Sequence, residues 1–283
     1  MMNRIFILFV LFSVLFVSAC QQNPEKHYLL LSHTRTTDTL VQGVDPRVEA
    51  LNLDDYDMLF LGGDMTEESS KEKATLEYLD KLFDLGAPTT LWALGNHDNA
   101  HNDWVSEFTG RPISYSYYQD GITYVVLYTQ EEKDWICTIT GPQLEMLKSV
   151  TDTISSSSHL IVLSHKLVWI MDNPELADHQ GKSFYDWSCN YRIHENNWNS
   201  DILPRLRAVQ DRGVQVICLG GDIGNNVRTF EEHTSDGIIY LASGIPVSQS
   251  LKPEAKILEF THNPETRTLT WDFVLLDSKV HSK

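Results

Sequence analysis

Four short segments of the sequence each end a run of apolar residues with side chains of metal-ligand type. The segments are Leu61–Asp64, Leu94–Asp98, Leu163–His165 and Leu219–Gly224. A buried strand that presents a polar side chain at its carboxyl end has this pattern, and in α/β proteins such strand ends meet at one edge of a sheet. The four segments together therefore predict an α/β fold with one shared site at the strand ends.

The first 20 residues read as a targeting segment outside the fold. Arg4 precedes the apolar run Ile5–Val17, which is short for a membrane span, and small residues then lead to Cys20. We predict a lipoprotein signal peptide over residues 1–20, with Cys20 lipidated, and a tether over residues 21–27. An ordinary secretion signal with an incidental cysteine is the alternative. The lipoprotein interpretation places the protein in the cell envelope, on a periplasmic or surface face, held to the membrane by its lipid anchor alone.

Residues 28–283 have the length and composition of one large domain. Hydrophobic residues make up 42% of the chain, which is enough for a sizeable core. The formal net charge is −17, and such a surface repels nucleic acid and anionic lipid headgroups. We therefore expect no nucleic-acid partner, and an anionic substrate needs local positive charge at the site.

Three cysteines follow Cys20 in the sequence. Cys218 lies inside an apolar strand and is expected to pack as a small hydrophobic side chain. Cys137 and Cys189 lie in predicted loops, where a disulfide is permitted outside the cytoplasm. Two free thiols are the alternative, because the sequence does not supply the geometry of a bond.

The hydrophobic pattern alternates strands with helices and ends in strands only. The expected strands are Tyr28–Ser32, Met58–Leu61, Thr90–Leu94, Ile122–Thr129, Leu160–Ser164, Val214–Leu219, Gly237–Ser243, Ala255–Thr261 and Leu269–Leu276. The expected helices are Glu67–Leu85, Pro142–Ile154 and Ile202–Arg212. This order is typical of a sheet-rich α/β protein with layered sheets.

In order and spacing, the four segments resemble the calcineurin-like metallophosphoesterase family over nearly all of residues 28–283. Leu94–Asp98 is the most specific match, and Gly141–Leu144 and Ile238–Gly244 fit the same pattern. The resemblance implies a four-layer αββα sandwich of two mixed sheets. It also implies a pair of metal ions and a phosphate ester substrate.

Several residues match metal ligands of that family. Asp64 matches the carboxylate that bridges both metals, whereas Asn96 and His165 match ligands of the second metal. Each also has a structural interpretation: a helix cap for Asp64, a turn residue for Asn96 and an ordinary buried or surface group for His165. The presence of all three in one order favours the metal site.

The family resemblance also assigns catalytic roles. His97 matches the histidine that donates a proton to the leaving oxygen, and Asp98 matches the group that orients it. A neighbouring carboxylate favours the charged imidazolium.

The first strand departs from the family pattern, which ends in Asp-x-His. Here the chain reads Ser32-His33-Thr34-Arg35. In the family register His33 stands for the aspartate and Arg35 for the histidine, and on an extended chain both face the site. A register one residue earlier places Leu31 and His33 there. In either case the first metal loses at least one ligand.

The last segment departs as well, since Gly-His-x-His is replaced by Gly221–Gly224. Asp222 can still bind a metal, but Gly224 has no side chain. The second metal therefore keeps Asp64, Asn96, His165 and Asp222, and the first keeps Asp64 with His33 as a further candidate. We predict one divalent ion, and these ligands suit Mn²⁺, Mg²⁺ or Fe²⁺ at least as well as Zn²⁺.

Two functions follow from this pattern. The first is a metal-dependent hydrolase of phosphomonoesters or phosphodiesters, in which Arg35 replaces the missing metal as a catalytic cation. In the other interpretation of Arg35, it pairs with Asp64 or Asp222 and only neutralises them. The second function is a decayed relative that binds a glycan or a protein of the cell envelope, suggested by the aromatic segment Phe184–Tyr191.

Overall fold

The computed structural model describes residues 25–36, 42–130, 137–170, 173–179, 197–224 and 229–280. The predicted signal peptide, Cys20, most of the tether, Cys189 and the aromatic segment 184–191 lie outside these ranges. Among the helices of the described ranges, none combines the length and the apolar character needed to span a membrane.

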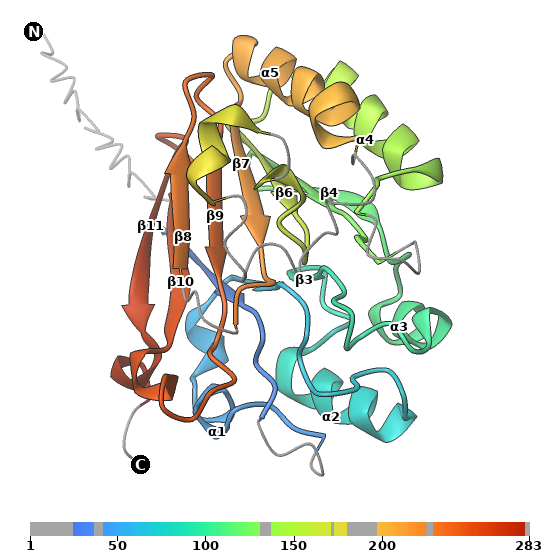
Figure 1. The fold of residues 1–283 in the computed structure, drawn as a ribbon, viewed down its shortest axis with the longest axis vertical. Coiled ribbons are helices and arrows are strands. Elements are labelled where there is room, and N and C mark those ends of the chain that lie inside the picture. The colour runs from blue at the N-terminus through green and yellow to red at the C-terminus, as the bar shows by residue number, and fades with distance from the viewer. Residues whose placement is uncertain are drawn as a thin grey trace, which may run out of the picture.

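Two mixed sheets form the centre of the molecule (Figure 1). The first has the order β11-β10-β1-β2-β3, in which β1, β2 and β3 are parallel and β10 and β11 are antiparallel to their neighbours. Its strands are β1 (Lys26–Leu31), β2 (Met58–Leu61), β3 (Thr90–Trp92), β10 (Lys256–Asn263) and β11 (Thr268–Leu275).

The second sheet has the order β4-β5-β6-β7-β9-β8, with parallel central strands and an antiparallel strand at each edge. Its strands are β4 (Tyr115–Gln119), β5 (Ile122–Val126), β6 (His159–Leu163), β7 (Gln215–Gly220), β8 (Thr229–His233) and β9 (Ile239–Ser243). The parallel strands are the ones that bring polar residues to a common edge.

Successive side chains on a strand point to opposite faces, and this period separates three cores. On β1, Tyr28 and Leu30 pack between the sheets, whereas Leu29 and Leu31 pack against helices outside the first sheet. The helices there are α1 (Pro46–Glu49), α2 (Lys73–Phe83) and α3 (Asn102–Thr109). The second sheet is covered by α4 (Gly141–Thr153) and α5 (Leu203–Asp211) (Figure 1). The predicted four-layer αββα sandwich is confirmed.

Short helical turns complete the connections. They are Leu53–Asp55, Val168–Ile170, Pro174–His179, Lys252–Glu254 and Leu276–Ser278, with a π-helical turn at Trp198–Ile202 just before α5.

The helix predicted over 67–85 is wrong at its amino end, because α2 begins only at Lys73. The preceding residues form a loop tied to the segment after β3: the Ser69 N–H donates to the His97 carbonyl, and the Ser70 hydroxyl donates to that of Asp98. These bonds hold the backbone away from helical geometry. Four further elements were not predicted, because they are short: β4, β8, α1 and α3. Strands β4 and β8 are also partly exposed and lie at the edges of their sheet.

Candidate metal and phosphate site

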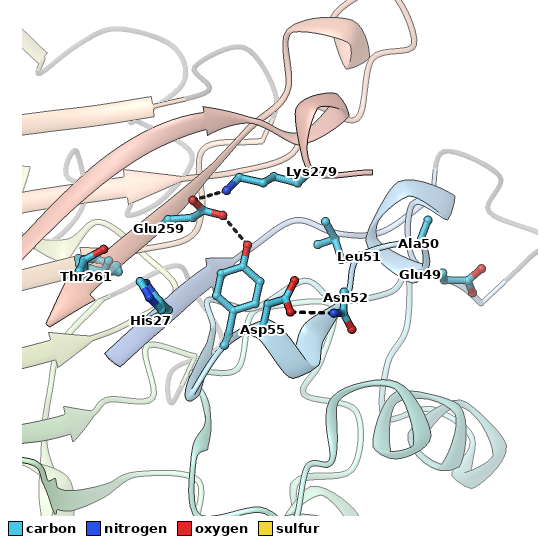
Figure 2. A pocket seen from close by; sticks show the side chains of 11 residues that line it. His27, Glu49, Ala50, Leu51, Asn52, Asp55, Glu259, Thr261 and Lys279 are labelled. Atoms are coloured by element: carbon cyan, nitrogen blue, oxygen red, sulfur yellow. Dashed lines mark hydrogen bonds and ion pairs between the residues drawn. The ribbon is translucent and has the colours of Figure 1, made fainter. Parts of the chain in front are cut away.

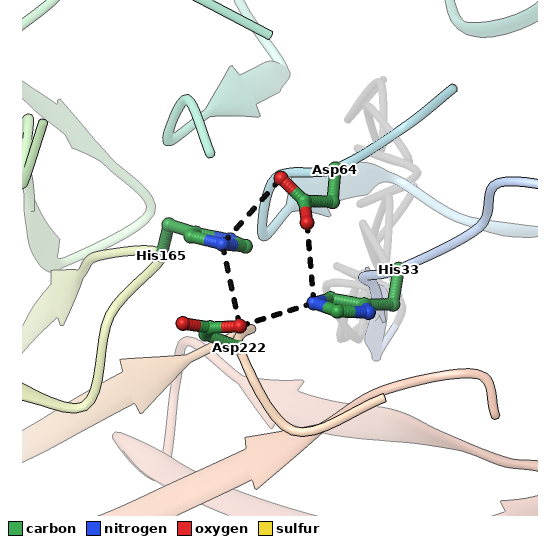
Figure 3. A group of neighbouring side chains, drawn as sticks. All are labelled: His33, Asp64, His165 and Asp222. Carbon is green, nitrogen blue, oxygen red and sulfur yellow. Dashed lines mark hydrogen bonds and ion pairs between the residues drawn. The ribbon is translucent and has the colours of Figure 1, made fainter. Parts of the chain in front are cut away.

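Four of the predicted ligands meet at the carboxyl ends of four strands. His33 and Asp64 follow β1 and β2 of the first sheet, whereas His165 and Asp222 follow β6 and β7 of the second. One ligand atom from each lies within 4.8 Å of the others, and Figure 3 shows the alternating ring of imidazoles and carboxylates. The site therefore lies where the two sheets meet.

The distances around this ring leave room for a shared partner. The Nε2 atom of His33 lies 3.2 Å from Asp222 Oδ1 and 3.4 Å from Asp64 Oδ2. The Nε2 atom of His165 lies 3.5 Å from Asp64 Oδ1 and 3.7 Å from Asp222 Oδ1. The two imidazoles are parallel, with an interplanar angle of 7° and ring centroids 5.7 Å apart. His33 thus joins the same group as the ligands predicted for the second metal, rather than forming a separate pocket.

The tautomer of His165 prepares its inner nitrogen to bind a cation. Its Nδ1 atom lies 2.7 Å from the Gly62 carbonyl oxygen, which can only accept, so Nδ1 carries the proton. In the neutral ring, Nε2 then has a lone pair that faces two carboxylates, and this atom is buried without a hydrogen-bond partner. A buried polar atom without a partner needs an explanation, and a metal ion held among these four side chains would supply the missing partner. The residues present therefore fit a divalent metal.

Two glycines let the backbone close around these side chains. A Cβ at Gly95 would lie 2.2 Å from Asp64 Oδ1, and one at Gly63 would lie 2.4 Å from His165 Nδ1. His33 and Asp64 themselves have positive φ angles of 51° and 56°. Non-glycine residues rarely adopt this conformation, which is costly and concentrates at functional sites.

Asp98 is a structural centre and does not orient His97. Its buried carboxylate accepts the N–H groups of Asp64 at 2.6 Å, Met65 at 3.1 Å and Gly95 at 2.8 Å, and the Ser69 hydroxyl at 2.5 Å. These four donors occupy both of its oxygens. The role that the family resemblance assigned to Asp98 is corrected accordingly: it holds the loops that carry Asp64.

His97 is oriented by Glu67 instead. Its Nδ1 atom lies 2.7 Å from the Glu67 carbonyl oxygen and 3.8 Å from a Glu67 carboxylate oxygen. Its Nε2 atom lies 3.9 Å from Asp64 Oδ2, at the side of the four-residue group. Glu67 was not among the predicted site residues; the signal in the sequence was an acidic residue three positions after Asp64 in the same strand-end loop.

Arg35 reaches this corner of the site although His33 is not extended. Its Nη1 donates to Glu67 Oε2 at 3.0 Å and to His97 Nε2 at 2.6 Å. Pairing with Asp64 or Asp222, which the neutralising interpretation required, is replaced by pairing with Glu67. The guanidinium therefore lies beside the predicted proton donor.

Asn96 lies in the turn after β3, where it is exposed. Its neighbours Gly95 and His97 both contact Asp64, through the close approach described above and through the His97 N–H, which donates to Asp64 Oδ1 at 3.0 Å. The role of Asn96 as an amide ligand stays a prediction.

The electrostatics keep the two ligand carboxylates charged. Burial raises the pKa of Asp64 and Asp222, but neighbouring imidazoles, His165 first, outweigh it and lower both below the usual value. Burial followed by the charge of Asp64 raises the pKa of Asp98. Lys166, buried and absent from the sequence prediction, has a pKa lowered by burial and partly restored by Asp222 and Asp64. A cation therefore lies near the carboxylates in addition to the imidazoles.

The cysteines are only partly described. Cys218 is free and fully buried, as expected of a small core residue, and burial raises the pKa of its thiol. Cys137 is buried and disulfide-bonded. Its predicted pairing with Cys189 falls outside the described residues and stays a prediction.

A large cavity of about 710 Å³ lies far from this chemistry, at the opposite end of β1 (Figure 2). There Lys279 pairs with Glu259 at 2.7 Å, and the Tyr56 hydroxyl donates to the same carboxylate. None of the four clustered residues lines it. Concave volume alone therefore does not identify the reactive site in this protein.

Comparison with known proteins agrees with the geometry. A family model described as calcineurin-like phosphoesterase matches residues 32–225, which include all four clustered residues. No curated protein matches the chain. Among solved structures, this chain is similar to the Vps29 protein of Chaetomium thermophilum. The match covers 88% of this chain and 96% of Vps29, with 9% sequence identity and a TM-score of 0.33. The family match spans more than half of the sequence, and the chain belongs to the calcineurin-like phosphoesterase family.

Proposed function

We propose that this protein hydrolyses a phosphomonoester or phosphodiester with one divalent metal ion, Mn²⁺, Fe²⁺, Zn²⁺ or Mg²⁺. One observation carries the proposal: the buried, unpartnered Nε2 of His165 faces two charged carboxylates beside a second imidazole. An ion held there would polarise a phosphoryl oxygen and lower the pKa of a bound water.

The residues beside that group suit the other requirements of ester hydrolysis. Arg35 carries a permanent charge and can grip a phosphate oxygen pair through two parallel hydrogen bonds. It now donates to Glu67 and His97, so a bound phosphate competes with these two for the guanidinium. When Arg35 turns to the phosphate, His97 Nε2 is free to take a proton and deliver it to the leaving oxygen.

Glu67 supports this use of His97. Its carbonyl holds the Nδ1 proton, which leaves Nε2 as the nitrogen that exchanges protons with the substrate. Its carboxylate also lies near the same nitrogen, with one oxygen 3.8 Å from Nδ1.

Hydrolysis of nitrophenyl phosphate and of bis-nitrophenyl phosphate, with each of the four metals added in turn, tests the function. We expect turnover with at least one metal and its loss in Asp64→Asn. Metal-loaded, folded protein without turnover on either ester would contradict the proposal. In that case the alternative of a binding protein would stand, although the aromatic segment that suggested it lies outside the described residues.

We further propose that lipidation of Cys20 anchors the protein in the cell envelope. The support is the sequence pattern of residues 1–20 alone. Fractionation of cells that express the parent and Cys20→Ser tests it, since the variant should leave the membrane fraction. Equal membrane association of the two would favour an ordinary signal.

A further inference from the structure

Gly224 lies directly against the ring of His33. A Cβ at position 224 would be 2.3 Å from His33 Nδ1, 2.5 Å from its Cγ and 2.6 Å from its Cβ. Real Cβ atoms essentially never approach other heavy atoms this closely. Any side chain at 224 and the present position of the His33 ring therefore exclude each other.

The two residues belong to the two segments that depart from the family pattern. The last segment lacks a side chain at 224, and the first segment places an imidazole in that volume. We propose that His33 supplies, from the other sheet, the metal-binding imidazole that residue 224 lacks, and that Gly224 is required to admit it. This inference rests on the proposed metal site but concerns only which side chains form it.

The position of His33 supports a ligand role. Its Nε2 atom faces Asp222 and Asp64 at 3.2 and 3.4 Å, as His165 Nε2 faces the same pair. Each imidazole thus bridges the two carboxylates from one side. Two neutral imidazoles and two carboxylates neutralise one divalent ion, and a nitrogen-rich set of this kind suits Zn²⁺, Fe²⁺ or Mn²⁺ better than Mg²⁺.

The backbone at both positions allows the imidazole to be moved from residue 33 to residue 224 by mutation. His33 has a φ of 51°, which glycine adopts without cost. Gly224 has no positive φ, and the three atoms nearest to its hypothetical Cβ all belong to His33. An imidazole can therefore be moved from 33 to 224 in the double variant His33→Gly/Gly224→His with little backbone strain.

Four variants of the full chain test the proposal: Gly224→Ala, His33→Gly, the double variant, and Gly86→Ala as the control. A Cβ at Gly86 would meet only the Phe108 carbonyl oxygen, at an ordinary 3.5 Å. Bound Zn²⁺ and Mn²⁺ per chain are measured by elemental analysis, and their affinities by chelator competition. Far-UV circular dichroism of the metal-free proteins checks that each variant is folded.

We expect about one ion per chain in the parent and in the control. Losing an outer hydrogen bond to a metal ligand weakens binding about 10–100-fold, and losing a ligand should cost at least as much. Each single variant should show that loss, and the double variant should recover most of it. If Gly224→Ala or His33→Gly keeps the parent affinity, or if the folded double variant stays as weak as His33→Gly, the proposal is overturned. Phosphatase assays are separate: an inactive parent that binds metal refutes the function and leaves this exchange standing.

Discussion

His97 and Arg35 meet across two loops that are 62 residues apart in the chain, with 2.6 Å between His97 Nε2 and Arg35 Nη1. A guanidinium only donates, so in this arrangement Nε2 is an acceptor and the imidazole has its single proton on Nδ1, towards Glu67. Nε2 therefore has no proton to donate while Arg35 bonds to it. The two residues have to be judged together, because the state of one sets that of the other.

Replacing His97 with alanine should lower turnover far more than metal content. His97 lies 3.9 Å from Asp64 Oδ2 and outside the four-residue group, and general acid catalysis contributes about 10²–10⁴-fold. Steady-state rates on an ester with a poor leaving group, with metal content measured in parallel, check this. His101→Ala, in the exposed turn before α3, is the control. Equal rates in His97→Ala and the parent would remove His97 from this role.

Arg35→Ala should weaken inhibition by phosphate and vanadate and lower turnover, with metal content unchanged. The physical reason is loss of the only described cation paired at the Glu67–His97 corner of the site. Arg35→Lys should not restore the phosphate affinity, because an ammonium cannot form two parallel bonds. Unchanged inhibition constants, or binding of a second ion, would instead favour a neutralising role.

Among the elements, those that form the site were the easiest to predict from sequence. Apolar runs form most of β1, β2, β6 and β7. A polar residue that directly follows such a run is expected at the carboxyl end of the strand. This logic found Asp64, His165 and Asp222, whereas His33 was predicted from the register of the family motif.

The loops between those elements could not be predicted in the same way. The positive φ of His33 breaks the extended register on which the predicted direction of Arg35 depended. Glu67 was assigned to a helix, because the bonds that hold its loop come from Asp98, a residue far along the chain. The fit between Gly224 and His33 depends on a distance between two sheets. Contacts between residues so far apart in the chain produce no periodic pattern in the local sequence, so the sequence alone did not predict them.

Asp98→Asn should destabilise the fold although it preserves shape. The carboxylate accepts four hydrogen bonds from three segments. In asparagine, one of the two accepting oxygens is replaced by an NH₂ group, which donates and cannot accept from these N–H and O–H groups. A buried donor or acceptor left unsatisfied costs about 1–3 kcal/mol. Urea unfolding measures the difference, with Asp103→Asn near the start of α3 as the control. A midpoint equal to the parent's would show that the loops do not depend on this charge.

At the scale of the whole molecule, the inter-sheet core carries its own titratable pair at the end remote from the site. His262 of β10 bonds the Tyr28 hydroxyl at 2.9 Å through Nδ1, and its ring packs edge-on against His159 of β6, with centroids 6.4 Å apart. Burial, followed by the neighbouring His262, lowers the pKa of His159 to about 4. Burial also lowers the pKa of His262.

The free energy of unfolding should decrease as the pH falls from 6.5 to about 4. A histidine with a folded pKa of about 4 and an unfolded pKa near 6.5 takes up its proton first in the unfolded chain. The contribution of the neutral, buried His159 to the free energy of unfolding is complete above pH 6.5 and decreases towards pH 4. Urea midpoints across this range should fall less steeply in His159→Gln than in the parent, whereas His233→Gln, at an exposed position, should follow the parent. Parallel curves for His159→Gln and the parent would contradict the prediction.

The position of the four clustered residues has a mechanical consequence. His33 and Asp64 extend from one sheet and His165 and Asp222 from the other, so a bound ion is a crosslink between the two halves of the sandwich. Ions that bind only the folded state stabilise it by mass action, by about 2.7 kcal/mol at a concentration 100 times the dissociation constant. Thermal unfolding should therefore shift upwards with metal in the parent and not in Asp64→Asn. The concentration of that divalent metal would then set the stability of the fold as well as the proposed rate of hydrolysis.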